Sequence, residues 1–374
     1  MNMRPNSEKE LADMVAATQT PLRIVGGGTR PIGKPCSAAP LHVSGLSGVT
    51  IYEPGALTLV AKAGTPLSDI ETILEAEGQR LAFEPMDHRP LLRTEGTPTI
   101  GGVVAGNISG PRRVSSVGSC RDALLGVRYV DGMGNIVKNG GRVMKNVTGY
   151  DLVKLFAGSW GTLGILSEVS LKVLPKPEAQ ATIILRDLEF SQAQEAMTIA
   201  LNSPYEVTGA ACDVQTKETF IRVEGFAASV QYRTGSLMKL LDLRTPFDLV
   251  SDSAASELIW RNIRDVVCLA DQDGDIWKLS VRPGDAPSIL ARADARQALV
   301  DWGGGLIWLR LDEGTDLRSR LGTISGHATL IRASDKTKNK LSVFQPEAAT
   351  VAKLSRGLRA KFDPRNILNP GLMH

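Results

Sequence analysis

The sequence predicts an α+β protein in two parts, a glycine-rich domain over residues 1–176 and a cap domain with an antiparallel sheet over residues 177–345. Fifteen of the 37 glycines lie in the stretch 96–164. Glycine adds no packing and costs conformational entropy on folding, so this density indicates backbone that turns with positive φ or lies directly against a bound group. Pro175 and Pro177 mark the boundary, and helices alternate with strands beyond them without glycine loops.

Length and composition set the broad class. The 374 residues are enough for two domains of ordinary size, and 43% of them are hydrophobic, which is enough to bury a core in each. The formal net charge is only +3, with the basic residues dispersed, so nothing indicates binding to nucleic acid or to an anionic membrane.

The N-terminus MNMRPNSEKE carries charges where a signal peptide needs an apolar segment, and no apolar run approaches the roughly 20 residues that span a bilayer. We therefore expect a cytoplasmic protein without a transmembrane segment. Cys36, Cys120, Cys212 and Cys268 are widely spaced and form no CxxC motif. This spacing predicts four reduced thiols and no iron–sulfur or structural metal site in this chain.

The first elements form a small α/β lobe over residues 1 to about 90. Ser7 and Glu10 make a capping-box pair that predicts a helix ending near Thr18. A later strand, Leu57–Ala63, is followed by a helix that Gly78 closes.

A strand over Leu22–Val25 ends in the glycine run Gly26–Arg30. A nucleotide P-loop would need a hydroxyl residue where Pro35 stands, and a Rossmann fingerprint would need a glycine where Pro31 stands, so neither motif is present. The run predicts either a loop that cradles a phosphate or an ordinary glycine turn between strands, and both remain open.

The second lobe, from about residue 91 to 176, begins after an extended segment, Glu84–Pro98. Strands at Leu124–Val130 and Asn135–Lys138 flank DGMG and predict a hairpin. Further along, the pattern predicts a helix at Tyr150–Phe156 and a half-buried strand at Ile165–Val173.

The cap shows helices and strands in turn and no evident internal repeat. A capping box of Ser191 and Gln194 predicts the start of its first helix, and a second helix is expected near residues 228–241. Its expected strands are Thr182–Arg186, Thr219–Val223, Ile276–Val281 and Gly305–Leu311.

The glycine-rich half resembles a known family, the FAD-binding domain shared by vanillyl-alcohol oxidase and p-cresol methylhydroxylase (PCMH-type). Within it the chain looks like the smaller flavin-binding subunits of bacterial glycolate oxidase (glycolate dehydrogenase) complexes. The matching segments are GPRR at 110–113, RDALLGVR at 121–128, GGRVMKNVTGYDL at 140–152, GTLGILSEVSLKVLP at 161–175 and KFDPRNILNPGLM at 361–373. The resemblance implies a two-lobed FAD-binding domain that holds FAD between its lobes, and a C-terminal segment, residues 346–374, that returns to this domain from the cap.

The resemblance also implies which residues line the cofactor. These are Gly26, Gly27, Gly28, Thr29, Thr99, Gly101, Gly102, Asn107, Ser109, Gly110, Gly118, Arg121, Asp122, Gly164 and Ile165. Arg121 and Asp122 could equally form a surface ion pair. Arg142 and Lys145 are either a solvated strand edge or cations near the negative charge that develops on a reduced flavin.

Many relatives tether FAD through a histidine in the first phosphate loop, and the loop VGGGTR contains none. The flavin should therefore be bound non-covalently. His42 and His88 are expected to have packing or surface roles.

The cap departs from its larger relatives, whose HxGDGNxH motif supplies histidines to a metal or to the substrate carboxylate. Here the corresponding stretch is DWGGGLIW, Asp301–Trp308, and SGHAT at 325–329 looks like a reduced form of a second motif. His327 is the remaining candidate catalytic base, with a core or interface histidine as the alternative.

The leading hypothesis is an FAD-dependent oxidoreductase subunit that acts on the CH–OH group of glycolate, a small 2-hydroxy acid, and yields glyoxylate. Its partners would be a larger flavin subunit and an iron–sulfur subunit, through which the complex could associate with a membrane. The alternatives are a non-catalytic scaffold that kept the flavin fold and a stand-alone flavin reductase of the same fold. We also expect an exposed apolar docking patch near Trp302 and Trp308, with core packing as the alternative.

Overall fold

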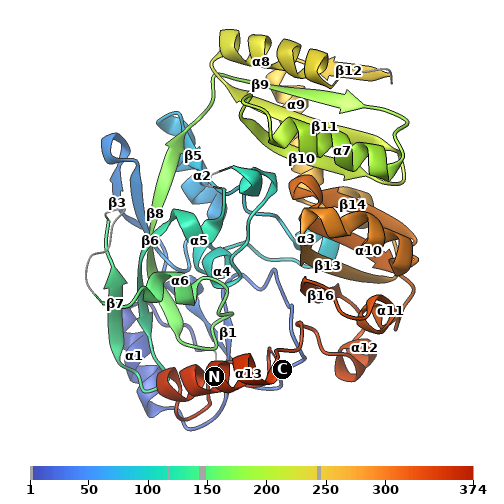
Figure 1. Cartoon of the computed structure of the whole chain (residues 1–374). Helices are drawn as coiled ribbons and strands as arrows, with labels where there is room; N and C mark the ends of the chain where they lie inside the picture. The colour runs from blue at the N-terminus through green and yellow to red at the C-terminus, as the bar shows by residue number, and fades with distance from the viewer. Residues whose placement is uncertain (1–2, 116–117, 143–148, 242–245, 374) are drawn as a thin grey trace.

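The computed structural model describes residues 3–115, 118–142, 149–241 and 246–373. The described chain forms two bodies, seen at the lower left and the right of Figure 1. The N-terminal domain contains the strands up to residue 175 together with the C-terminal segment, and the cap contains the strands from residue 179 to residue 332.

The first helix, α1 (Glu8–Ala17), begins where the sequence predicts. The Ser7 side chain accepts a hydrogen bond from the Glu10 backbone N–H at 3.1 Å, and the Glu10 carboxylate accepts one from the Asn6 N–H at 2.8 Å. Leu11 and Val15 on its inner face are buried. The side-chain cap and the apolar face together define this helix.

The N-terminal domain is built on two sheets. Strands β1 (Leu22–Val25) and β2 (Ala39–His42) form a parallel pair, and the first glycine run follows β1. The larger antiparallel sheet has the order β3-β4-β8-β6-β7, with β5 also paired to β8. Its strands are β3 (Val49–Glu53), β4 (Thr58–Lys62), β5 (Gln79–Leu81), β6 (Leu124–Val130), β7 (Ile136–Gly140) and β8 (Ile165–Pro175).

This pairing differs from the expected division into lobes at about residue 90. Strands β3, β4 and β5 come from the first 90 residues, yet β4 and β5 pair directly with β8. Among the described strands of the N-terminal domain, only the β1–β2 pair stands apart from the larger sheet. The alternation in Leu57–Ala63 predicts the strand itself but not its partner, because pairing over more than 100 residues leaves no local pattern.

The helices of this domain are short, apart from α1 and α2. They are α2 (Leu67–Ala76), α3 (Arg89–Leu92), α4 (Ile100–Ala105), α5 (Cys120–Ala123) and α6 (Leu152–Phe156). Helices α2, α4, α5 and α6 pack on the larger sheet, where the core includes Phe83, Val103 and Phe156, and α3 packs against β16 of the cap.

The cap contains one antiparallel sheet of eight strands in the order β12-β9-β11-β10-β14-β15-β13-β16. Its strands are β9 (Ala179–Leu185), β10 (Val207–Asp213), β11 (Glu218–Gly225), β12 (Phe247–Val250), β13 (Asp275–Val281), β14 (Gln297–Asp301), β15 (Leu306–Leu311) and β16 (Gly326–Arg332). Its helices are α7 (Phe190–Leu201), α8 (Ala227–Leu240), α9 (Ser253–Arg264), α10 (Ala286–Ala293) and α11 (Leu317–Leu321).

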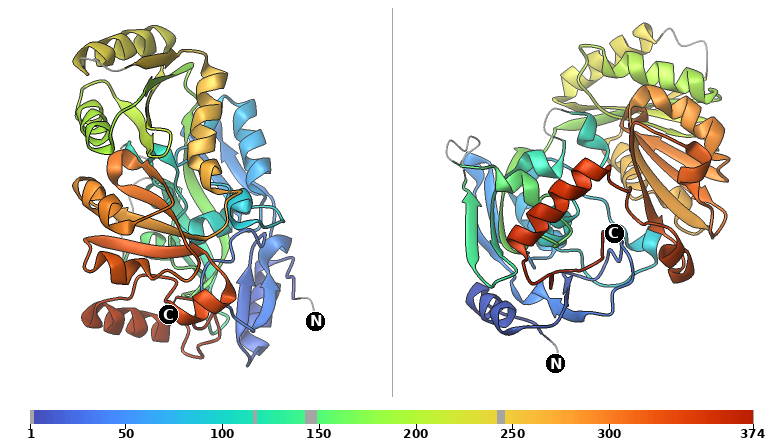
Figure 2. Two further views of the ribbon diagram at one scale, coloured as in Figure 1. Left: turned by 90° about the vertical axis from the view of Figure 1, so that its right-hand side faces the viewer. Right: turned by 60° about the horizontal axis from the view of Figure 1, so that its bottom comes forward.

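The element order shows that the cap is an internal repeat, which the sequence did not reveal. The series β9-α7-β10-β11-α8-β12 and β13-α10-β14-β15-α11-β16 are both split βαβ units with the same strand arrangement. The two units join edge to edge through the antiparallel pairing of β10 with β14. Figure 2 shows the resulting continuous sheet with helices packed on it.

The cap differs from the sequence predictions at the start of α7 and in four strands that were not predicted, β10, β12, β14 and β16. The capping box of α7 consists of Glu189 and Gln192, two residues before the predicted pair. Strand β10 was missed because its sequence, VTGAACD, is rich in residues with weak strand preference. Gly209 is required there, since a Cβ atom would lie 2.6 Å from the Trp260 ring.

After the cap, α12 (Asp335–Lys340) and α13 (Ala349–Phe362) lead into the C-terminal segment. This segment returns to the N-terminal domain beside β1: the Leu22 N–H donates to the Ile367 carbonyl at 2.7 Å, and the Ile24 N–H donates to the Asn369 side chain at 2.8 Å. The end of the chain thereby forms one wall of the site described next.

Candidate cofactor-binding site

A cavity of about 410 Å³ lies between the first glycine run, the start of α4 and the C-terminal segment. Its volume falls within the range of about 300–1,000 Å³ that is usual for ligand and cofactor pockets. The structure brings nine of the predicted cofactor residues to its lining. They are Gly26, Gly27, Gly28, Thr29, Thr99, Gly101, Gly102, Gly164 and Ile165.

In the first loop, Gly26 and Gly27 have no room for a side chain. A Cβ atom at Gly27 would collide with the Thr97 carbonyl oxygen, and one at Gly26 would lie 2.5 Å from the Thr99 hydroxyl oxygen. Gly28 has φ +72° and no heavy atom within 4 Å of its Cβ position, so it faces open space. Consecutive bare N–H groups in such a loop form a nest that suits an anion such as a pyrophosphate.

The opposite wall begins at the N-cap of α4, where the Thr99 side chain accepts from the Gly102 N–H at 3.4 Å. A Cβ atom at Gly101 would lie 2.6 Å from the Ala63 Cβ, so this glycine permits the close packing of α4 on the sheet. A Cβ atom at Gly102 would meet Arg30 Nη1 and Thr99 Oγ1, each at 3.3 Å. Gly101 is therefore needed for the packing of α4 on the sheet, whereas the absence of a side chain at Gly102 keeps the cavity open.

Arg30 is a cavity residue that the sequence reasoning missed. Its Nε and Nη2 atoms are buried and have no hydrogen-bond partner among the described residues. Burial lowers the pKa of this guanidinium to about 10, which still leaves it charged at neutral pH. A buried cation with unused donors fits an anionic oxygen of a bound group. The available signal was an arginine directly after the glycine run.

His88 interacts electrostatically with Arg30 and with Lys278 of the cap. His88 is buried, its Nδ1 lies 3.3 Å from the Met86 carbonyl oxygen, and burial together with the charges of Arg30 and Lys278 holds its pKa well below the ordinary value. Lys278, on β13 of the cap, has its Nζ 5.6 Å from the centroid of the Trp308 ring, and burial lowers its pKa to about 8. The lowered pKa leaves His88 uncharged at neutral pH, between two cations.

Six predicted cofactor residues do not line this cavity, and four of them maintain local structure. The Asn107 side chain accepts from the Arg121 N–H at 3.0 Å, and the Ser109 hydroxyl accepts from the Cys120 N–H at 3.0 Å. Asp122 accepts from the Ser119 hydroxyl at 2.5 Å. The Arg121–Asp122 pair is half-exposed with a separation of 3.9 Å, as the surface-pair alternative predicted.

The other two are the glycines of the GPRR segment and the loop that follows it. A Cβ atom at Gly110 would collide with the Glu84 carbonyl oxygen, and the Gly110 carbonyl accepts from the Trp302 indole N–H at 3.0 Å. A Cβ atom at Gly118 would collide with the Arg112 backbone. Both glycines permit close backbone packing at the junction between the domains, which a glycine count cannot distinguish from cofactor contact.

The remaining candidates have varied positions. Arg142 is exposed and pairs with Glu53 at 2.8 Å, which agrees with the solvated-edge alternative, and Lys145 lies outside the described residues. His327 is exposed on β16, opposite Ser280 of β13, and does not line the cavity.

The predicted apolar patch at Trp302 and Trp308 was wrong. Trp308 is only 3% exposed, and Trp302 is half-buried against Gly110 at the domain junction. Asp301 beside them is buried, and burial raises its pKa to about 7 although it accepts from the Trp302 N–H at 2.6 Å. The stretch that replaces the histidine motif thus belongs to the contact between the cap and the N-terminal domain.

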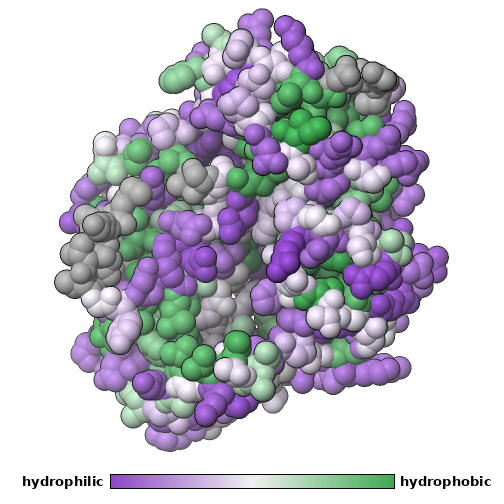
Figure 3. Space-filling model, in the orientation of Figure 1, coloured by the Kyte–Doolittle hydropathy of each residue, from purple (hydrophilic) through white to green (hydrophobic). Residues whose placement is uncertain are grey.

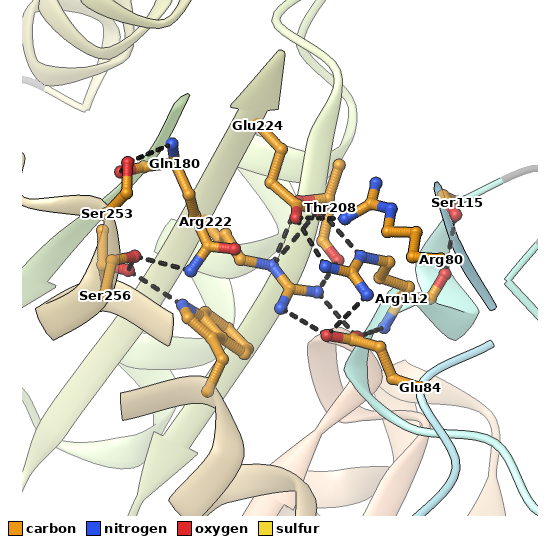
Figure 4. A network of polar contacts seen from close by, with 12 residues as sticks. Arg80, Glu84, Arg112, Ser115, Gln180, Thr208, Arg222, Glu224, Ser253 and Ser256 are labelled. Atoms are coloured by element: carbon orange, nitrogen blue, oxygen red, sulfur yellow. Dashed lines mark hydrogen bonds and ion pairs between the residues drawn. The ribbon is translucent and has the colours of Figure 1, made fainter. Parts of the chain in front are cut away.

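That contact is centred on a buried cluster of charges, shown in Figure 4. Glu84 accepts from both terminal nitrogens of Arg222 at 2.9 Å, and Arg112 bridges Glu84 at 2.9 Å and Glu224 at 2.7 Å. Arg80 also donates to Glu224 at 2.7 Å. Against the effect of burial, Arg222 and Arg112 hold the pKa values of Glu84 and Glu224 below the ordinary value. Both carboxylates therefore stay ionised.

The described residues contain neither a candidate metal cluster nor a candidate membrane span. No group of three or more histidine, cysteine, aspartate or glutamate side chains in that part of the chain could hold a metal ion. Across the same residues, no helix is long and apolar enough to cross a membrane.

Comparisons with known proteins indicate FAD as the ligand of this domain. A family model described as an FAD binding domain matches residues 2–140. Glycolate oxidase subunit GlcE of Escherichia coli (strain K12) is 33% identical over 98% of this chain and 96% of its own length. Glycolate oxidase subunit GlcD of Bacillus subtilis (strain 168) is 26% identical over 85% of this chain and 75% of its own length.

Two further matches have lower sequence identity or rest on the fold alone. Mitochondrial D-2-hydroxyglutarate dehydrogenase of Bos taurus is 27% identical over 83% of this chain and 64% of its own length. A solved structure of alkyldihydroxyacetonephosphate synthase superposes with a TM-score of 0.69 at 16% identity, covering 98% of this chain and 76% of that chain. At this identity the structural match shows the fold alone.

Proposed function

The chain belongs to the family of FAD-binding glycolate oxidase subunits, and we propose that it is the FAD-binding subunit of a complex that oxidises glycolate to glyoxylate. The observation that carries this proposal is the cavity itself. Two glycine walls meet a buried guanidinium with unused donors, on a chain related over nearly its full length to a glycolate oxidase subunit.

The cavity residues fit FAD by their donor chemistry. The bare N–H groups of Gly26–Gly28 suit the pyrophosphate, and Gly102 leaves space where the cofactor passes α4. Arg30 would donate to an anionic oxygen of the bound cofactor. When bound, FAD supplies the two-electron acceptor for oxidation of the hydroxy acid.

We propose non-covalent binding, because no histidine lines the cavity among the described residues. Cys36 is the lining thiol. Acid precipitation should release intact FAD into the supernatant from both the wild type and the Cys36→Ser variant. Flavin that stays with the precipitated wild-type protein would contradict this assignment.

The substrate-oxidising role of this chain depends on its partners in the proposal. The cap has Asp301 and Trp308 where larger relatives have histidines, and both side chains are buried in packing. The cysteines have no ligand spacing for an iron–sulfur cluster, so we place the onward relay on an iron–sulfur subunit and substrate oxidation chiefly on a larger flavin subunit.

Steady-state assays with glycolate and an artificial electron acceptor test this division. We expect the isolated chain to bind FAD and turn over glycolate poorly, and the co-expressed complex to be active. Equal turnover per flavin in both samples would make this chain the dehydrogenase itself. A folded chain that is colourless and takes up no added FAD would instead indicate a scaffold.

A further inference from the structure

Helix α13 lies on the surface of the N-terminal domain with almost no packing. It is 14 residues long, and none of its side chains, all within the described part of the chain, is buried. Val351, Leu354 and Leu358 are 50%, 66% and 39% exposed. Figure 1 shows the helix along the lower front of the molecule, and Figure 3 shows hydrophobic residues gathered over this region.

The exposed residues form one stripe. Their spacing of three and then four residues places them on the same side of the helix. A helix of 14 residues is marginal in water unless tertiary packing stabilises one face. Here packing is concentrated at the C-terminal end, where the Phe362 ring lies 5.7 Å from the Phe156 ring and 6.2 Å from the Tyr129 ring. The helix is therefore anchored at its C-terminal end, and its apolar stripe is exposed to solvent.

The charges on α13 have one sign. The segment 349–362 contains two lysines and two arginines, and it contains no acidic residue. The chain as a whole is nearly balanced, at +3. A surface that covers α13 should therefore combine an apolar floor with carboxylates at its rim.

We propose that α13 is a docking helix that inserts its Val351–Leu354–Leu358 stripe into an apolar, acid-rimmed groove on the larger flavin subunit of the complex. The proposal rests on the proposed function, which places this chain in a multi-subunit oxidase. Anchors at i, i+3 and i+7 are typical of helix-in-groove recognition.

A protein groove suits this stripe better than a lipid surface does. A helix that lies in a membrane interface typically has a broad apolar face with Trp, Phe or Leu, and this stripe is one residue wide and contains no aromatic residue. A helix of this length spans about 21 Å.

The test measures binding of the chain, loaded with FAD, to the purified larger flavin subunit of the same organism by calorimetry. Leu354→Glu/Leu358→Glu should weaken binding at least about tenfold, and Lys353→Glu/Arg356→Glu should weaken it less and reduce its salt dependence. Leu258→Glu is the matched control, because Leu258 is 53% exposed on α9 of the cap. It should bind like the wild type, and all variants should keep their FAD content and melting temperature.

The outcomes distinguish the larger flavin subunit from a membrane or a second copy of this chain as the partner of the stripe. Unchanged affinity of the Leu354/Leu358 variant overturns the docking helix while leaving the proposed function intact. A wild-type chain that does not bind the larger subunit at all contradicts the partnership in the proposed function instead. Flotation of the wild-type chain with phosphatidylglycerol vesicles, or concentration-dependent dimerisation in sedimentation, lost in the same variant, would assign the stripe to a membrane or to a second copy.

Discussion

The cofactor cavity and the charge cluster at the domain junction use opposite means to arrange polar groups. Around the cavity the backbone is bare, and the Arg30 guanidinium keeps unused donors. At the junction, Arg112 and Arg222 are paired with Glu84 and Glu224 through several bonds of 2.7–3.0 Å. The first region is complete only with a ligand, and the second is largely complete by itself.

The two regions differ in whether their buried cations are paired. An unsatisfied buried cation costs stability unless a ligand arrives, so it is a sign of function. A buried cation that is paired on both sides holds two elements in a fixed relation, here the N-terminal domain and β11 of the cap. Substitution of a paired arginine at the junction should therefore lower the unfolding free energy. Substitution of Arg30 in the cavity should lower FAD affinity and slightly raise the stability of the FAD-free protein.

The largest expected effect is from breaking the cluster. Arg222→Met would leave Glu84 buried beside fewer cations, and loss of one partner of a buried pair typically costs about 3–5 kcal/mol. Urea unfolding should show this loss. The exposed Arg296–Asp312 pair provides the control, since Arg296→Ala should cost less than about 1 kcal/mol. Equal costs for the two variants would show that the cluster is not structural.

Asp301 tests the same junction through pH. Burial raises its pKa in the folded state to about 7 from 3.8, so the folded protein holds a proton that the unfolded chain releases. The contribution of Asp301 to the unfolding free energy should therefore fall between about pH 4 and 7, by roughly 4 kcal/mol at most, and then level off. Asp301→Asn lacks this fall, and its stability relative to wild type should rise across the same window. A difference that does not depend on pH would contradict the shift.

Arg30→Gln should have the opposite signature to Arg222→Met. Loss of a hydrogen bond to a charged group costs about 1.5–3 kcal/mol, so FAD affinity should fall roughly 10- to 150-fold. The FAD-free protein should become slightly more stable, because Nε and Nη2 of the guanidinium are buried without a hydrogen-bond partner among the described residues. Arg23 lines the same cavity but is exposed, and Arg23→Gln should leave both quantities near wild type. Fluorescence titration and thermal unfolding measure the two effects.

The smallest expected effect on the fold is at Gly102. Its Cβ position meets only the ends of the Arg30 and Thr99 side chains, at 3.3 Å, so Gly102→Val should fold with a modest loss of stability. The branched side chain would reach into the cavity, and FAD retention should fall about tenfold or more. Wild-type flavin content in the folded variant would show that FAD does not pass this position. Gly27→Val, which collides with the Thr97 backbone, should instead impair folding.

Much of the local structure followed from the sequence. The Ser7 cap, the hairpin of β6 and β7 and the strand β8 depend on neighbouring residues, and the structure has all three. The glycine run at residues 26–28 left a phosphate loop and an ordinary turn open, and the resemblance implied Gly101 and Gly102 as cofactor residues; the structure places all five glycines at one cavity. The same argument was misleading at Gly110 and Gly118, where the close neighbour is protein.

Tertiary structure decided what depends on distant partners. The pairing of β4 with β8, the joining of the two cap units through β10 and β14, and the meeting of Glu84 with Arg222 all link segments far apart in the chain. The exposure of the α13 stripe was likewise visible only in the fold. By itself the sequence determined where backbone turns, helices begin and side chains are absent, since these are set within a few residues. Whether a buried charge is satisfied or left open for a ligand depends on which distant groups the fold brings to it.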